Sequence, residues 1–308
     1  MNPDPNRSLP SVEWPTLLLL AGTYLAWGFA TWAWGWSGPL SVVVTGWFIA
    51  QFSSLQHEAL HGHPFRNPLI NEALVFPALT LIVPFARFRD THLQHHFDPN
   101  LTDPYDDPES NFVDPAIWPH IPRPIRALLR LNNTLLGRIT IGTALGIAHW
   151  LVAEAKLIRK GTPGIARAWA MNALGWVPVF AWLVWVGMPV WAYLISVYLG
   201  LSLTRIRTFL EHRAHEACRG RTVIIEDRGP LSILFLNNNF HAVHHMHPQV
   251  PWYQLPRLYA QHKDHYQRRN DGYIYRNYAQ IFARYLVKAK DPVPHPIWPV
   301  RKSDAPKG

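Results

Sequence analysis

The sequence predicts an all-α integral membrane protein with four transmembrane helices in two hairpins and a cytoplasmic helical cap. Hydrophobic residues make up 48% of the 308 residues and charged residues only 16%, below the roughly 25% of an ordinary soluble domain. Four apolar segments approach the length of about 20 residues that crosses a bilayer. Many of the 15 tryptophans lie near the ends of apolar runs, a placement typical of membrane interfaces.

The four expected spans are paired by short turns. They cover about residues 15–36, 40–55, 169–186 and 190–203. The breaks within the pairs are Ser37-Gly38-Pro39 and Gly187-Met188-Pro189, where glycine and proline interrupt a helix. Each pair is therefore expected to form a tight helical hairpin.

Two further apolar stretches are not expected to span. Residues 73–85 are interrupted by Pro77 and ended by Pro84, and about 13 residues suit an interfacial or re-entrant segment. Residues 135–157 mix apolar side chains with Arg138, His149 and Glu154 at amphipathic spacing. We expect this stretch to lie along the membrane surface.

Basic residues predict the topology. Neither hairpin turn contains Lys or Arg, whereas the segments after the second and fourth spans are rich in both. By the positive-inside rule these segments, residues 56–168 and 204–291, form the cytoplasmic cap. We expect a single domain over residues 1–308, a retained first span without a cleaved signal peptide, and a poorly ordered tail over residues 292–308.

Charge and cysteine content narrow the function. The net charge is +9, but no Lys/Arg run of the kind that binds nucleic acid is present. The charge instead suits an anionic membrane face, where a basic residue gains about 1 kcal/mol. The one cysteine, Cys218, excludes an internal disulfide and an iron–sulfur cluster held by this chain alone. Electrons, where needed, must come from another protein.

Three histidine clusters and one further histidine are the main chemical feature. Within each cluster the spacing of three or four residues places the imidazoles on one face of a helix. Imidazole binds iron, zinc and copper, and a zinc ion takes only three or four such ligands. Nine histidines therefore predict two metal ions, held in the cap by His57, His61, His92, His95, His96, His212, His241, His244 and His245.

Two alternatives belong to other classes. His57-Glu58-Ala59-Leu60-His61 matches HExxH, the zinc-protease motif in which Glu58 would be the general base. An intramembrane metalloprotease would leave the other clusters without a role. The second alternative is a non-catalytic membrane protein that binds metal or haem. Such a protein would not require nine histidines at ligand spacing.

HEALH, HLQHH and HAVHH, set around two hairpins, resemble the three histidine boxes of the membrane fatty acid desaturase superfamily. The order, the spacing and the extra histidine before the third box match. Box three, within NNNFHAVHHMHP, is more similar to bacterial fatty acid desaturases than to carotenoid ketolases. The resemblance implies a non-haem di-iron centre, with all nine histidines as ligands and no catalytic side chain beyond them.

The resemblance also implies an activity, namely an oxygen-dependent fatty acyl desaturase. Two iron ions, two electrons and dioxygen as co-substrate would remove hydrogen from an unactivated methylene. The alternative is a hydroxylase or ketolase acting on a carotenoid or other lipid, because placement of the substrate carbon decides the outcome. The expected partners are a lipid or acyl-thioester substrate and a separate electron donor of ferredoxin, rubredoxin or cytochrome b5 type, without nucleic acid. The expected location is the bacterial inner membrane, with the active site on the cytoplasmic side.

Several neighbours of the boxes are candidates for supporting roles. Glu211 is expected to orient a ligating imidazole. One of Asn237, Asn238 and Asn239, with Asn237 as the first candidate, is expected to orient a ligand or hold a metal-bound water, and helix capping is an equal alternative for these asparagines. Arg205 and Arg207 are interpreted as positive-inside anchors, with pairing to a lipid or carrier head group as the alternative. Solvated loop positions are expected for His63, His215 and His247, with support of the ligands or contact with a lipid head group as the alternatives. Most of the carboxylates near box two are also expected to be solvated, while some accept N–H bonds from ligating imidazoles; these carboxylates are Asp90, Asp98, Asp103, Asp106, Asp107 and Glu109.

Overall fold

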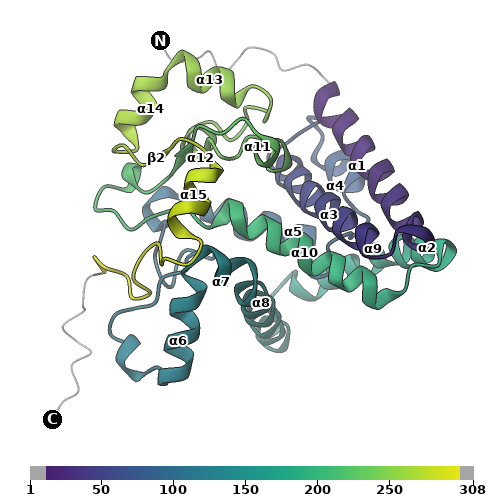
Figure 1. Cartoon of the computed structure of the whole chain (residues 1–308), viewed down its shortest axis with the longest axis horizontal. Coiled ribbons are helices and arrows are strands. Elements are labelled where there is room, and N and C mark those ends of the chain that lie inside the picture. The colour runs from purple at the N-terminus through teal and green to yellow at the C-terminus, as the bar shows by residue number, and fades with distance from the viewer. Residues whose placement is uncertain (1–11, 299–308) are drawn as a thin grey trace.

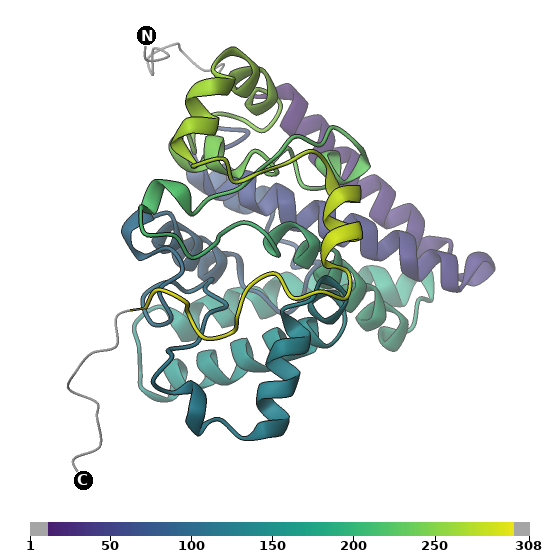
Figure 2. The ribbon, with the colours of Figure 1, turned by 60° about the vertical axis from the view of Figure 1, so that its left-hand side comes forward.

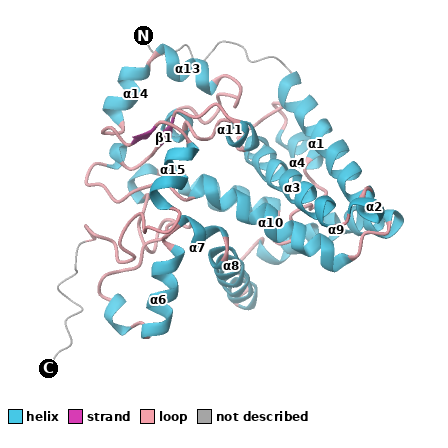
Figure 3. Cartoon of the chain, viewed as in Figure 1, coloured by secondary structure: helices cyan, strands magenta, loops and turns pink. Residues whose placement is uncertain are grey.

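The computed structural model describes residues 12–298, which are predominantly helical (Figure 1, Figure 3). Five helices of 19 to 22 residues dominate the molecule. They are α1 (Trp14–Trp32), α3 (Pro39–Leu60), α8 (Ile141–Arg159), α9 (Ile165–Val186) and α10 (Val190–Thr208). All five are rich in apolar residues, and the shorter elements adjoin their ends in the chain.

The shorter elements lie mostly beside the histidine-bearing ends of the long helices. The helices are α2 (Trp34–Ser37), α4 (Pro68–Leu74), α5 (Phe85–His95), α6 (Arg123–Asn132), α7 (Leu135–Ile139), α11 (Pro230–Leu234), α12 (His241–Met246), α13 (Leu255–Gln261), α14 (Lys263–Arg269) and α15 (Tyr278–Tyr285). Single 3-10 turns occur at Asp98–Asn100, Trp118–His120 and Cys218–Gly220. The strands β1 (Ile224–Ile225) and β2 (Ile274–Tyr275) pair in parallel, with Ile224 opposite Ile274.

Both predicted turns occur where glycine and proline indicated them. Gly38 adopts φ 40° between α2 and α3, and Gly187 adopts φ 74° at the end of α9. The first pair packs as expected, because α1 lies along α3. The expectation of a tight second hairpin is wrong: beyond the turn, α10 packs along α3, while α9 contacts α1, α5 and α8.

A close approach of two backbones explains why α10 prefers α3. A Cβ atom on Gly200 would lie 2.8 Å from Ile49 Cγ2 and 2.9 Å from the carbonyl oxygen of Gly46. A Cβ on Gly46 would lie 3.0 Å from the carbonyl oxygen of Ser196. Small residues allow such contact between helices in an apolar environment. The α3–α10 pair therefore forms the central packing unit of the long helices.

Within residues 12–298, two helices are long and apolar enough to cross a membrane by length and composition, and these are α8 and α9. Only 17% and 22% of their apolar windows are buried within the protein, so most of this apolar surface faces outward. The α9 helix coincides with the third expected span. The α8 helix lies in the stretch that we expected to run along the membrane surface, and its length and composition also suit a membrane span.

The proline-interrupted stretch forms α4 and then a buried, non-helical segment before α5. Its carbonyl oxygens are bonded by side chains of the long helices: Asn172 Nδ2 and Trp176 Nε1 both donate to Leu81, at 2.7 and 2.9 Å. The hydroxyl of Tyr193 donates to the carbonyl oxygen of Leu79 at 2.8 Å. Non-helical backbone in apolar surroundings requires such partners. The segment thus connects box one to box two through the helix bundle.

The expectation of a poorly ordered tail is wrong for residues 292–298, whereas residues 299–308 lie outside the described part. The segment that follows α15 is extended and crosses the molecule (Figure 2). Val293 accepts a hydrogen bond from the amide of Val113, and the amide of His295 donates to the carbonyl of Val113. Both Val293 and His295 are buried. Proline content indicated disorder, but these contacts with the loop after box two hold the segment in place.

We expect Gly200→Ala to destabilise the folded protein by about 1–3 kcal/mol, since the added methyl group forces α3 and α10 apart. Gly22→Ala is the matched control, because a Cβ there meets nothing within 4 Å and alanine is the better helix former. Thermal unfolding in detergent micelles measures both. Equal melting temperatures for the two variants would contradict the role of the α3–α10 contact.

Candidate metal centre

Four segments bring histidines to one place. His57 lies in the last turn of α3, and His61 follows as its C-cap residue. The α5 helix carries the second cluster and α12 the third. His212 lies just beyond α10, where its backbone bridges to Thr222. Because α3 continues to Leu60 rather than ending near residue 55, box one belongs to the same rigid helix as the expected second span.

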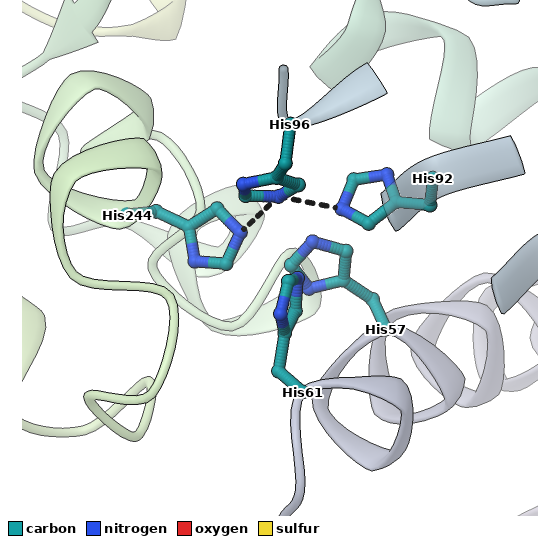
Figure 4. A group of neighbouring side chains, drawn as sticks. All are labelled: His57, His61, His92, His96 and His244. Carbon is teal, nitrogen blue, oxygen red and sulfur yellow. Dashed lines mark hydrogen bonds between the residues drawn. The ribbon is translucent and has the colours of Figure 1, made fainter. Parts of the chain in front are cut away.

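The nine histidines divide into two groups of neighbours, within each of which the ligand atoms lie within 4.8 Å of one another. The first histidine group contains His57, His61, His92, His96 and His244. Figure 4 shows these five imidazoles pointing toward one another from α3, the end of α5 and α12. The second histidine group contains His95, His212, His241 and His245. The structure thus brings together every histidine that the sequence singled out.

Within each group the Nε2 atoms approach one another closely. His96 Nε2 lies 3.0 Å from His92 Nε2 and 3.2 Å from His244 Nε2 (Figure 4). In the second group His212 Nε2 lies 2.8 Å from His95 Nε2 and 3.2 Å from His241 Nε2. A neutral imidazole has one donor and one acceptor nitrogen, so converging Nε2 atoms cannot satisfy one another fully. Such convergence suits a shared cation.

Two further atoms support a cation at the first group. His57 Nε2 and His61 Nε2 are both buried without a hydrogen-bond partner among the described residues. Buried polar atoms usually have a partner, and a lone pair directed at a metal ion is one such partner. The donor set is entirely nitrogen, with five imidazoles in one group and four in the other. Imidazole donors suit iron as well as zinc, so the residues fit a non-haem metal.

The opposite ring nitrogens, Nδ1, bond outward to fixed acceptors. His95 Nδ1 lies 2.8 Å from Asp107 Oδ1, and His92 Nδ1 lies 3.0 Å from Glu109 Oε1. His241 Nδ1 lies 3.0 Å from Asn238 Oδ1. When Nδ1 donates its proton outward, the lone pair of Nε2 faces the centre. These three partners therefore select the tautomer and the ring orientation that a metal ligand needs.

The loop after α5 holds its carboxylates firmly. Asp107 Oδ2 accepts a hydrogen bond from the amide of Thr102 at 2.9 Å, and Oδ1 accepts one from the amide of Glu109. Two of the six carboxylates that the sequence placed near box two therefore contact ligating imidazoles. Asp103, by contrast, accepts from the amides of Tyr105 and Asp106. Asp107 and Glu109 are thus the carboxylates that contact imidazoles of the histidine groups, as we expected for some members of this set.

Burial keeps most of these rings neutral. Burial first, and then the neighbouring histidines, lower the pKa of His96, His212, His241 and His244. His95 differs: burial alone would lower its pKa, but Glu109 and Asp107 outweigh that effect and raise the pKa to about 9. Those carboxylates therefore favour positive charge at His95. A metal ion bound to His95 Nε2 provides such charge.

Glu211 lies behind the second group. It is buried beside His241, with Oε1 3.9 Å from Nδ1, and it forms an ion pair with Arg207 at 3.1 Å. Asn238 Nδ2 donates to Glu211 at 3.4 Å. Asn237, expected to orient a ligand, instead donates to the carbonyl oxygen of Trp252. Asn238, another of the three candidate asparagines, makes the contact with an imidazole, that of His241; sequence spacing did not decide between them.

The position of Glu58 in box one contradicts the protease hypothesis, and the position of His63 beside it contradicts the expected solvation. Glu58 Oε2 accepts a hydrogen bond from the amide of Trp252 at 3.1 Å, and Oε1 lies 3.8 Å from His57 Nδ1. The carboxylate thus lies on the outer side of the imidazole, an unsuitable place for a general base. His63 is not solvated but buried, with Nδ1 2.8 Å from Glu13 Oε1.

Together the fold and the site define a helical protein with outward-facing apolar helices and a buried, two-part histidine centre that can hold metal. The family model for fatty acid desaturases matches residues 30–277. The chain belongs to the fatty acid desaturase family. Membership of this family places the chain among the oxidoreductases.

Three chloroplastic omega-6 fatty acid desaturases are similar to the chain. The protein from Spinacia oleracea is 23% identical over 79% of this chain and 57% of its own length. The protein from Brassica napus is 26% identical over 72% and 51%, and that from Arabidopsis thaliana 24% over 80% and 56%. The chain therefore matches little more than half the length of these relatives.

We expect Asp107→Asn to lower the affinity for a divalent metal about 10- to 100-fold, because His95 loses the charged partner that orients it. Asp103→Asn is the matched control in the same loop, since its carboxylate accepts only from backbone amides in the described hydrogen bonds. Competition of each purified variant with a chromogenic chelator measures the affinity. An equal loss of metal affinity in both variants would show that the substitutions act through the loop rather than through His95.

Proposed function

We propose that the chain is an oxygen-dependent fatty acyl desaturase that introduces a double bond into an acyl chain through a di-iron centre. The observation that carries this proposal is the gathering of all nine histidines into two adjacent groups, inside the segment that matches the family. The names of the three relatives support acyl desaturation as the reaction. The proposed ligands are the five histidines of the first group for one iron ion and the four of the second for the other.

The chain's own residues prepare the centre. Bound iron would supply the dioxygen chemistry that removal of hydrogen from an unactivated methylene requires. Asp107, Glu109 and Asn238 orient the imidazoles through Nδ1. Leu55 and Ala59 flank His57 on α3 and belong to the buried apolar cluster of the long helices. This cluster provides an apolar, water-poor environment beside the centre, which would suit an apolar substrate.

The proposed setting is a bacterial inner membrane, with four spanning helices and the centre on the cytoplasmic side. The apolar, outward-facing α9, which coincides with the third proposed span, supports insertion in a membrane. The distribution of Lys and Arg supports the cytoplasmic orientation. The substrate would be a lipid or an acyl thioester, and a separate redox protein would deliver the electrons.

Lipid analysis tests the reaction. In a host without a desaturase of its own, cells making the protein should gain unsaturated acyl chains, detected by gas chromatography with mass spectrometry. His95→Ala should abolish the product, because the second group loses one of four ligands. Hydroxylated or keto lipids in place of alkenes would instead establish the alternative, a hydroxylase or ketolase.

Metal analysis tests the centre independently of the reaction. Purified protein should contain about two iron ions per chain, since each group has enough imidazoles for one ion. His61→Ala and His241→Ala, one in each group, should each lower the iron content. His247→Ala is the control, because this histidine lies beside box three but in neither group. Protein without bound iron would contradict a di-iron enzyme.

A further inference from the structure

A second feature of the cap is a concentration of positive charge between α8 and α10. Arg138 of α7 is buried, and its nitrogens donate to neutral oxygens: the carbonyl of Asn132 and the side chains of Asn111 and Asn133. Burial lowers the pKa of Arg138, and the nearby charge of Arg205 in α10 lowers it further, to about 9. Among the described residues neither arginine forms an ion pair with a carboxylate.

The position of Arg205 depends on a glycine of α8. A Cβ on Gly146 would lie 2.1 Å from Arg205 Nη2, so the guanidinium occupies the space that a side chain would fill. The two helices are aligned there by Ser202, which donates to Thr143 at 3.0 Å, and by Tyr198, which donates to the carbonyl of Thr140. The charge of Arg205 is therefore fixed between the helices.

An unsatisfied donor lies on the same face of α8. Trp150 follows Gly146 by four residues, one helical turn further along. Its Nε1 atom is buried and has no hydrogen-bond partner among the described residues. An indole N–H only donates, as does a guanidinium. These two donor groups, with no hydrogen-bond acceptor among the described residues and close to a second buried arginine, suit the binding of an anion.

One carboxylate acts on Arg205 from a distance. Glu109, which bonds His92, raises the pKa of Arg205 through its charge, although burial has the larger and opposite effect. Its contact with His92 commits it to the histidine centre. The site between α8 and α10 thus lies beside the loop that supports the first histidine group. A substrate head group bound at this site would lie next to the histidine centre, and the acyl chain of the substrate would extend away from the site.

We propose that Arg205 and the indole N–H of Trp150, with Arg138 behind them, bind a phosphate oxyanion in the head group of the acyl substrate. The proposal rests on the proposed function, because it identifies how that substrate is recognised. Charge-assisted hydrogen bonds from a guanidinium to phosphate are short and strong. Two sources carry this chemistry: the phosphates of a coenzyme A thioester and the phosphodiester of a phospholipid.

Binding measurements with the intact protein in nonionic detergent test the site without turnover. The probes are stearoyl-coenzyme A, distearoyl phosphatidylglycerol and stearamide, which has the acyl chain but no phosphate. Arg205→Gln should weaken binding of one phosphate-bearing probe by about 10- to 100-fold and leave stearamide unchanged. The probe that responds identifies the source. Arg159→Gln is the control, an exposed arginine at the end of α8.

A second variant separates recognition from folding. Trp150→Phe keeps the aromatic ring but removes the N–H, and it should weaken the same probe by about 3- to 10-fold. Iron content serves as the independent measure for both variants. If both retain iron and bind every probe as tightly as the unaltered protein, the anion site is refuted. Absence of iron from the purified wild-type protein would refute the proposed function. The effect of the two substitutions on probe binding would still test the anion site.

Discussion

The centre depends on one constraint: nine imidazoles, five of them buried and four half-buried, must converge with most rings neutral and with their Nε2 lone pairs directed inward. Burial alone does not achieve this, because an imidazole can carry its proton on either nitrogen. The contacts of Nδ1 with outer acceptors select the tautomer that has its proton on Nδ1. Asp107 does this for His95, and Asn238 does it for His241. Each acceptor is itself held, Asp107 by the amide of Thr102 and Asn238 by its contact with Glu211. Ligand geometry is therefore a property of the whole cap rather than of the histidines alone.

The long helices serve this constraint by placing the segments that carry the boxes. Box one ends α3, and His212 follows α10 directly, so the close contact at Gly46 and Gly200 sets the distance between the two segments. Because both helices are rigid and touch at the backbone, a shift at this contact is transmitted to both histidine groups. Box two reaches the same place through the non-helical segment that Asn172 and Tyr193 anchor. This dependence explains why small residues are needed far from the centre.

Sequence spacing predicted the part of the site that depends on local structure. Intervals of three and four residues fix which histidines share a helix face, so the eight box histidines could be named in advance, whereas His212 was named because it follows the last expected span. Contacts between distant segments were beyond this reasoning. Six carboxylates flank box two, and only the folded loop determines that Asp107 and Glu109 turn inward. The choice of Asn238 over Asn237 depends on backbone conformation, since Asn237 adopts φ 53°. The packing of α10 on α3 rather than α9 likewise follows from a tertiary contact.

Charge balance gives the two histidine groups different surroundings. His95 of the second group contacts Asp107 at 2.8 Å and has Glu109 Oε2 3.9 Å from its Nε2, and Glu211 lies beside His241. In the first group Glu109 contacts His92, whereas Glu58 stays 3.8 Å from His57. Three carboxylates, Asp107, Glu109 and Glu211, therefore approach the second group, and two, Glu58 and Glu109, approach the first, although Glu211 is also paired with Arg207. Since carboxylates stabilise a cation even without direct coordination, this arrangement would favour a cation at the group with fewer imidazoles, and Glu109 would act on both groups at once.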